Sequence, residues 1–322
     1  MAPTFEKGKQ QRLAHSQSAS DVLKAFVAGI PQTHVALAGR VLGMVAYFLD
    51  LRHRRIVRRN LQFTHPEWSK NRIRRLAKGV FQSVGVTFAE ICQMTCFSDE
   101  DILRKVRIKG EENLLSSMKS REGVILISAH LGNWEMAHLA VSCYLQGPLV
   151  LVARRIDSRR LHRWLNDLRS RFGSVVLDKR QALGRMARAL KGGGVVGLLI
   201  DQGTRQSEGV EVTFLGRTTT ATPAAALLAR RYKSTVLPAF CVRQRDGKLT
   251  LLVEPPLKLQ RTQDPGADLR ENTQRMTSAL EAAVRAYPEQ WFWFHKRWKR
   301  HYPYLYREDL ASRQRRRERR RA

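Results

Sequence analysis

Short runs of apolar residues alternate with helix-like segments along most of the chain after residue 120. The runs occupy residues 123–128, 149–153, 195–200, 236–242 and 249–253. Helical segments separate most of these runs, and that alternation predicts a largely parallel central sheet flanked by helices. We therefore expect an α/β fold in which active residues lie at the carboxyl ends of strands. Residues 71–94 carry apolar side chains at spacings of three and four, which predicts an amphipathic helix.

The N-terminal part of the chain divides into a polar and an apolar stretch. Residues 1–21 are polar and lack the compact apolar run and cleavage site of a secretory signal. Residues 22–51 are mostly apolar, but they are interrupted, and residues 35–51 fall slightly short of the ~20 residues that span a bilayer. Arginines cluster directly afterwards, as expected beside anionic lipids. We predict a membrane-associated helix at 22–51, with a core helix as the alternative.

The charge of the chain is strongly positive. There are 58 Lys and Arg residues against 28 Asp and Glu, which gives a net charge of +30. Such a balance favours polyanionic partners, namely nucleic acid, anionic lipid headgroups or acidic carrier proteins, and charge alone does not rank them. The four cysteines form no CxxC pair, so neither a disulfide framework nor a metal site is indicated. The arginine-rich stretch 307–322 is expected to be a disordered tether.

The first of the apolar runs leads into a histidine. His130 follows residues 124–129, and residues 131–135 then turn into a helical stretch from 136 to 144. A histidine at such a turn can take a proton from an attacking hydroxyl when a carboxylate orients its ring. We predict that Glu135 supplies this carboxylate, which makes His130 and Glu135 a catalytic pair. Helix N-terminal amides near Gly132 and Asn133 are candidates for stabilising an oxyanion.

Polar side chains also follow two of the other runs. Asp201 and Gln202 end the run 195–200, and a parallel sheet would bring them to the same edge as His130. We expect them to position substrate, with a simple turn before Gly203 as the alternative. Arginines follow the run 149–153, where guanidinium groups suit phosphates or an oxyanion. Because many arginines crowd that stretch, a solvated basic face is the competing interpretation.

Taken together, these motifs resemble the bacterial lipid A biosynthesis lauroyl and myristoyl acyltransferases, within the lysophospholipid acyltransferase-like superfamily. The most specific string is residues 128–135, Ser-Ala-His-Leu-Gly-Asn-Trp-Glu. Further blocks follow in the order that this family shows: Arg58-Arg59-Asn60-Leu61 with Pro66-Glu67, Asp201-Gln202, Phe214-Leu215-Gly216-Arg217, Thr222-Pro223 and the aromatic and basic run from Trp291 to Trp298. The resemblance covers roughly residues 22–306, which we take as the N-terminal helix at 22–51 and an acyltransferase domain at 52–306.

The resemblance implies a glycerolipid acyltransferase-like fold, with His130 and Glu135 as the dyad of a histidine-x4-acid (HxxxxE) motif. It implies acyl carrier protein as the acyl donor and an anionic hydroxyacyl glycolipid, the Kdo-bearing lipid A precursor, as the acceptor. It also places the protein at the cytoplasmic face of the inner membrane, without a metal or other cofactor. The residues to which we assign substrate binding are Asn133, Arg155, Arg169, Asp201, Gln202 and Arg217. We expect the run Trp291 to Trp298 to meet the lipid headgroup boundary, with a purely packed C-terminal helix as the alternative.

Two rival functions stay open at this point. An acyltransferase that acts on another glycolipid or phospholipid, such as a phosphatidylinositol mannoside, would carry a similar motif. A non-enzymatic nucleic-acid-binding protein would also explain the charge, but no helix-turn-helix, zinc-finger or RRM signature accompanies the arginines. We therefore expect no specific nucleic-acid partner.

Overall fold

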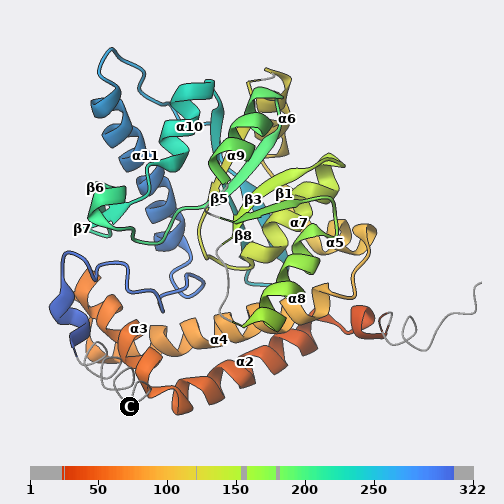
Figure 1. Ribbon diagram of the computed structural model, residues 1–322. Helices are drawn as coiled ribbons and strands as arrows, with labels where there is room; N and C mark the ends of the chain where they lie inside the picture. Colours follow the sequence, from red (N-terminus) through yellow and green to blue (C-terminus); the bar gives the residue numbers. More distant parts are fainter. Residues whose placement is uncertain (1–23, 25, 121, 154–157, 179–181, 308–322) are drawn as a thin grey trace, which may run out of the picture.

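The computed structural model describes residues 24, 26–120, 122–153, 158–178 and 182–307. The polar segment 1–21, most of the arginine-rich stretch 307–322 and Arg155 lie outside these ranges. Within them the chain forms an α/β sandwich with a helical layer at one end (Figure 1).

A seven-stranded sheet forms the centre of the molecule, in the order β1-β9-β8-β2-β5-β3-β4. All neighbouring strands are parallel except β8 and β9, which pair antiparallel. The strands are β1 Val106–Lys109, β2 Val124–Ser128, β3 Leu149–Ala153, β4 Val175–Asp178, β5 Val195–Leu199, β8 Thr235–Arg243 and β9 Leu249–Val253. A separate antiparallel pair comprises β6 Val210–Phe214 and β7 Arg217–Ala221. The mostly parallel sheet predicted from the sequence is confirmed.

Helices cover both faces of this sheet, which explains why its strands are apolar on both sides. In β2, Ile125 and Ile127 belong to one core cluster, whereas Val124 and Leu126 belong to the other. The first cluster lies against α9 Ala182–Lys191, α10 Ala224–Tyr232 and α11 Pro265–Ala286. The second lies against α5 Asp99–Lys105, α6 Glu111–Lys119, α7 Trp134–Leu145 and α8 Arg159–Ser170. Because β2 is a central strand, the residues that follow its carboxyl end lie in the middle of that edge of the sheet.

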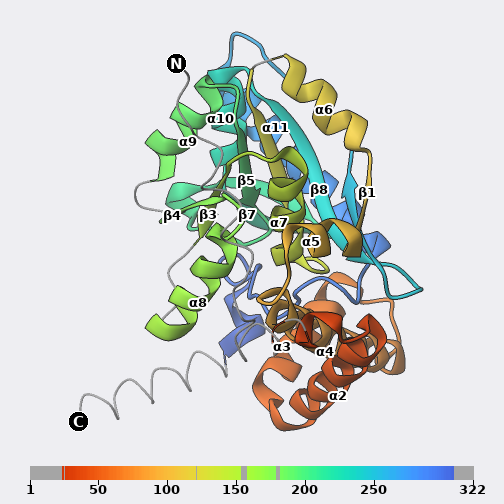
Figure 2. The same cartoon turned by 90° about the vertical axis from the view of Figure 1, so that its right-hand side faces the viewer.

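The end layer consists of α2 Gln32–Leu49, α3 Leu51–Thr64 and α4 Lys70–Met94, and both ribbon views place it at one end of the molecule (Figures 1 and 2). Helix α2 packs very closely on α4, since a Cβ atom added to Gly43 would lie 2.2 Å from the carbonyl oxygen of Phe81. No described helix is by itself long and apolar enough to cross a bilayer. Helices α2 and α3 meet that test only as a pair, and they are bent by 94° at their junction.

The aromatic run near the C-terminus packs into the core, contrary to the lipid contact expected from the sequence. Trp291, Trp293 and Trp298 are each at most 1% exposed and belong to the large core cluster. Their rings contact one another edge to face, with centroids 4.7 Å apart for Trp291 and Trp293. The physical reason is that the chain after α11 turns back under the sheet edge, where Leu131 and Trp291 form a β-bridge.

Candidate active site

The turn after β2 is fixed to its surroundings mainly through its backbone. The carbonyl of His130 accepts a hydrogen bond from the amide of Phe292 at 2.9 Å, and the amide of Gly132 donates to Gln290 at 3.0 Å. Gly132 has a φ of 60°, and a Cβ atom there would lie 2.1 Å from the carbonyl oxygen of Cys241. Only glycine fits this position, so the turn that presents His130 depends on it.

A buried carboxylate holds the imidazole of His130, and it belongs to Asp201. Nδ1 of His130 lies 2.8 Å from Oδ1 of Asp201, while Oδ2 accepts from the backbone amide of His130 at 3.1 Å and from the indole of Trp291 at 2.9 Å. This network assigns the proton to Nδ1 and leaves Nε2 as the basic nitrogen. The sequence-based prediction gave this orienting contact to Glu135, and the structure gives it to Asp201.

Glu135 instead forms a two-pronged ion pair with Arg169 of α8. Nε and Nη2 of Arg169 donate to its two carboxylate oxygens at 2.8 and 2.5 Å. Nδ1 of His138 lies 3.8 Å from the same carboxylate. Because Glu135 is in the first turn of α7, its side chain turns toward α8 rather than back to His130. Its charge nevertheless acts on His130 through space.

Electrostatics in the site favour a charged Asp201 and a more basic His130. Burial alone would lower the pKa of His130, but the charge and hydrogen bond of Asp201, with a contribution from Glu135, outweigh it and raise that pKa. Burial would raise the pKa of Asp201, yet His130 and the indole of Trp291 keep that pKa far below its usual range. The pKa of Glu135 is likewise lowered, since Arg169 overcomes the effect of burial. The arrangement suits a histidine that is neutral before it accepts a proton and whose protonated form is then stabilised by Asp201.

A third group beside the pair is His295, whose ring centroid lies 5.1 Å from that of His130. Burial lowers the pKa of His295 to about 4, so its ring is neutral near pH 7. His130, Asp201 and His295 offer ligand atoms within 4.8 Å of one another. The oxygens of Asp201 already accept three hydrogen bonds, however, so we interpret His130 and Asp201 as a hydrogen-bonded pair with the ring of His295 packed beside it. His295 belongs to the aromatic and basic run from Trp291 to Trp298, and the sequence predicted no role for it.

The structure separates the remaining predicted residues. Gln202 lines the cavity described below, and its Nε2 lies 3.2 Å from Nε2 of His295. Asn133 is fully buried, where its Oδ1 accepts from the amide of Met136 and caps α7. Arg217 donates to the carbonyl of Phe63 at 2.9 Å and lies outside the cavity lining. Asn133 and Arg217 therefore both have structural contacts and lie outside the cavity lining, and their binding of substrate stays a prediction.

A buried ion pair supports the His130 turn from beneath. Glu90 of α4 accepts two hydrogen bonds from Arg243 of β8, at 3.0 and 2.6 Å, and one from Nδ2 of Asn133 at 3.0 Å. The side chain of Gln32, at the start of α2, donates to the same carboxylate at 2.7 Å. The pair thus connects the end layer directly to the turn. No local sequence pattern marks it, because Glu90 and Arg243 are far apart along the chain.

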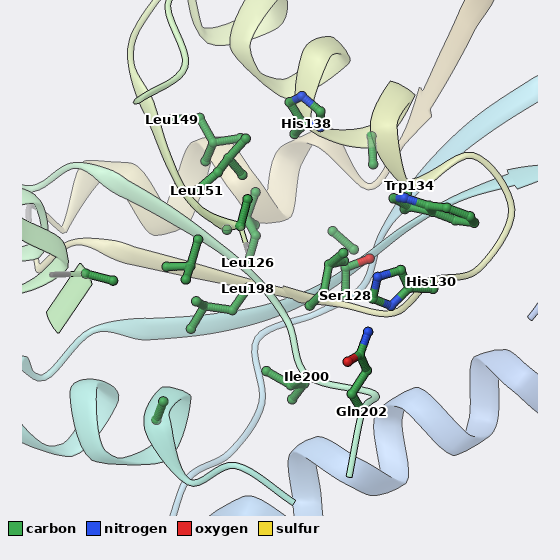
Figure 3. A pocket seen from close by; sticks show the side chains of 18 of the residues that line it. Leu126, Ser128, His130, Trp134, His138, Leu149, Leu151, Leu198, Ile200 and Gln202 are labelled. Carbon is green, nitrogen blue, oxygen red and sulfur yellow. The ribbon is translucent and has the colours of Figure 1, made fainter. Parts of the chain in front are cut away.

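A cavity of about 600 Å³ opens beside His130 and continues among apolar side chains (Figure 3). Its polar wall includes His130, Glu135, Arg169 and Gln202, and most of the rest is aliphatic. Among the described residues, Nη1 of Arg169 is buried without a hydrogen-bond partner. A histidine beside a largely apolar cavity suits an enzyme that brings a hydrophobic chain to a reacting hydroxyl.

Comparison with known proteins identifies the family. The sequence profile described as bacterial lipid A biosynthesis acyltransferase matches residues 7–300, and the chain belongs to this family. It is 28% identical over 278 residues to the lipid A biosynthesis lauroyltransferase of Escherichia coli, which is 85% of this chain and 88% of that protein. It is 22% identical to the E. coli lipid A biosynthesis palmitoleoyltransferase over 84% of this chain and 86% of that protein. A phosphatidylinositol mannoside acyltransferase of Mycolicibacterium smegmatis is 27% identical over 58% of this chain and 60% of its own length. The protein is therefore an acyltransferase of the lipid A type.

Proposed function

We propose that this enzyme transfers a fatty acyl chain from acyl carrier protein to a hydroxyl group of a lipid A precursor. The observation that carries the proposal is the position of His130, which is oriented by Asp201 and lines a largely apolar cavity. Both E. coli relatives named for lipid A biosynthesis align over more than four fifths of the chain, whereas the phosphatidylinositol mannoside relative aligns over 58%. The lipid A acceptor is thus the better supported one.

The chemistry is a direct attack by the acceptor on the thioester. Nε2 of His130 removes the proton from the acceptor hydroxyl, and the resulting oxygen nucleophile attacks the carbonyl carbon. Asp201 stabilises the imidazolium that forms. Collapse of the tetrahedral intermediate breaks the carbon–sulfur bond, and His130 returns its proton to the leaving thiolate. The products are an ester and the thiol of the carrier, so atoms and charge balance without a covalent enzyme intermediate.

The oxyanion of that intermediate needs hydrogen-bond donors, and the backbone amides suggested by the sequence are already occupied. The amide of Gly132 donates to Gln290, and the amide of Asn133 donates to Cys241 at 2.8 Å. Nη1 of Arg169 is the better candidate, because it is buried beside the cavity without a hydrogen-bond partner among the described residues. Its ion pair with Glu135 fixes the guanidinium plane, which gives the acid at position 135 a positioning role. In this proposal Glu135 acts through Arg169.

Helix α2 is the proposed contact with the membrane. Its outward face exposes large apolar side chains: Leu37, Val41, Leu42, Val45, Phe48 and Leu49. The opposite face is fixed against α4, so this helix lies along the protein surface and presents a continuous apolar strip. The arginines of α3 follow immediately and suit anionic headgroups. We propose that this strip docks the enzyme on the cytoplasmic face of the inner membrane, where its lipid acceptor is found.

The test is acyl transfer from a mixed pool of acyl carrier protein thioesters to a Kdo-bearing lipid A precursor, read by mass spectrometry. Wild type and His162→Ala should add one acyl group, and His130→Ala should lose transfer by orders of magnitude while keeping its melting temperature. His162 is a suitable control because it lies on α8 outside the cavity lining. Transfer to a phosphatidylinositol mannoside but not to the lipid A precursor would show that the proposed acceptor is wrong. Salt-resistant duplex binding without any transfer would support the nucleic-acid alternative.

A further inference from the structure

The cavity beside His130 is lined by residues from both faces of the sheet, and we call the part on each face a limb. The α7 limb, under helix α7, is lined by Leu126, Ala137, Val141, Leu149, Leu151 and Gly197. The α9 limb, on the opposite face, is lined by Ala182, Leu183, Met186, Leu198 and Ile200. In Figure 3, Leu149 and Leu151 lie on one side of the strand that leads to Gln202, and Ile200 lies on the other. Each limb offers a separate path for a hydrocarbon chain.

One residue in the lining of the α7 limb, in the middle of the sheet, has no side chain. Gly197 lies on β5 between Leu126 of β2 and Leu151 of β3. A Cβ atom added there would lie 2.8 Å from Cδ2 of Leu151 and within 4 Å of both methyl groups of Leu149. Glycine in a central strand lacks a side chain to pack, and it often marks a place where a ligand comes close to the backbone. Gly197 is also partly accessible, as is Leu151 beside it, although Leu126, Val196 and Leu198 are buried.

The depth of the α7 limb matches an acyl chain. Gly197 is in register with Leu126, four residues before His130, which corresponds to about 13 Å along the strand direction. Leu149 is in register with Val195, and Val195 with Val124, so the limb reaches a level about 20 Å from His130. One leaflet of a bilayer has a hydrocarbon thickness of roughly 15 Å. A chain of that length, held at its reacting end by His130, would therefore pass over Gly197 and end between the levels of Gly197 and Leu149.

The walls also distinguish the two limbs. Val141 and Leu149 of the α7 limb are almost fully buried, and Leu183 of the α9 limb is 55% exposed. The polar donor proposed for the oxyanion, Nη1 of Arg169, belongs to the helix next to α7. His138 also lines the α7 limb, and burial lowers its pKa to about 4, which keeps it neutral beside a hydrocarbon.

We propose that the acyl chain of the donor thioester occupies the α7 limb and that Gly197 determines how long this chain can be. The inference rests on the acyl transfer proposed above and adds the place of the donor chain and the residue that sets its length. A side chain at position 197 would close the limb near the level of Leu151 and Leu126. The enzyme would then prefer a shorter chain, because the last methylenes of a long chain would have no space.

The experiment compares Gly197→Val with Leu198→Phe, a change at the next residue that adds volume on the opposite face. Valine suits a strand, and the flexible end of Leu151 is the main group that must move. Gly197→Ala serves as a milder variant should the valine destabilise the fold. Each protein is given a graded pool of saturated acyl carrier protein thioesters, and the ratio of kcat/KM for short against long chains is measured. Displacement of two to three methylenes by the valine should change this ratio roughly 15- to 60-fold in favour of short chains.

Leu198→Phe should leave the length preference unchanged. The assignment is overturned when Gly197→Val keeps the wild-type profile, or when Leu198→Phe alone shifts it, since the latter result would place the chain in the α9 limb. A second measurement separates this proposal from the acceptor assignment. Binding of free fatty acids of graded length, followed by thermal shift, needs no turnover and should show the same shorter limit in Gly197→Val. If the enzyme transfers nothing to the lipid A precursor but Gly197→Val still binds only shorter fatty acids, the result contradicts the proposed acceptor and not the assignment of the α7 limb.

Discussion

Replacement of Asp201 by asparagine tests the assignment of the residue that orients His130. Three N–H groups converge on the two oxygens of Asp201, and two of them, the amide of His130 and the indole of Trp291, reach the same oxygen, Oδ2. An asparagine would therefore place its carbonyl at that position and its NH₂ group toward Nδ1 of His130. Nδ1 must then accept, the proton moves to Nε2, and the imidazole no longer has a free lone pair for the acceptor hydroxyl.

The expected loss is large. In serine proteases the same change at the triad aspartate lowers kcat about 10⁴-fold through the wrong tautomer. A loss of that size corresponds to about 5 kcal/mol of transition-state stabilisation. The second effect is on the pKa of His130, because Asp201 is the main group that raises it while burial lowers it. The acid limb of the pH–rate profile should consequently move to lower pH in Asp201→Asn.

The assay is single-turnover acyl transfer across a pH series, together with a melting curve. Asp268→Asn is the matched control, because Asp268 is equally buried and pairs with Arg230, away from the cavity lining. Both variants lose a buried carboxylate, but only Asp201→Asn should lose the chemical step at unchanged substrate binding. Transfer by Asp201→Asn within about tenfold of wild type, a difference of only about 1.4 kcal/mol, would refute the reasoning.

Three further outcomes are expected. Transfer by the wild type should fall as the pH drops through the pKa of His130, because protonation removes the base, and the charge of Asp201 raises that pKa above its ordinary value. A pH profile of kcat/KM measures this, and a flat profile would contradict it. Glu135→Gln should leave Arg169 as an uncompensated buried charge and lower the free energy of unfolding by about 3–5 kcal/mol, as measured by urea denaturation; Glu271→Gln, which alters an exposed ion pair, should cost under 1 kcal/mol. Gly43→Ala should clash with the backbone of Phe81 and destabilise the fold by about 1–3 kcal/mol, whereas Gly29→Ala, with open space around it, should not; equal melting temperatures would argue against the close contact of α2 and α4.

The sheet was predictable because its inner strands carry a strong local signal. The five apolar runs found in the sequence all became strands. Such strands are covered on both faces, as β2 shows with Ile125 in one core cluster and Leu126 in the other. The edge strands were not found. Strand β1, Val106–Lys109, has four residues with a half-polar pattern, and its identity depends on pairing with β9 across more than a hundred residues. Short polar segments of this kind take their structure from tertiary contacts.

The site was predictable in its location but not in its partners. His130 could be found because an apolar run leads directly to it, and Asp201 because the same rule applies to β5. Which carboxylate faces the imidazole of His130 depends on the direction of each side chain. Glu135 lies in the first turn of α7, and its side chain points toward Arg169. Sequence proximity to His130 therefore favoured the wrong orienting carboxylate.

The buried pair of Glu90 and Arg243 has a practical consequence for handling this protein. The helical layer that exposes the apolar strip also supplies Glu90, which holds Asn133 beneath the His130 turn, and Thr87, whose hydroxyl donates to the carbonyl of Gly132 at 3.0 Å. A shortened chain that begins after α4, made to avoid the need for detergent, would remove these contacts to the turn. It would also leave the guanidinium of Arg243 buried without its carboxylate partner. Solubility is better sought by recoding the outward side chains of α2, which leaves its glycine face, and everything that rests on it, in place.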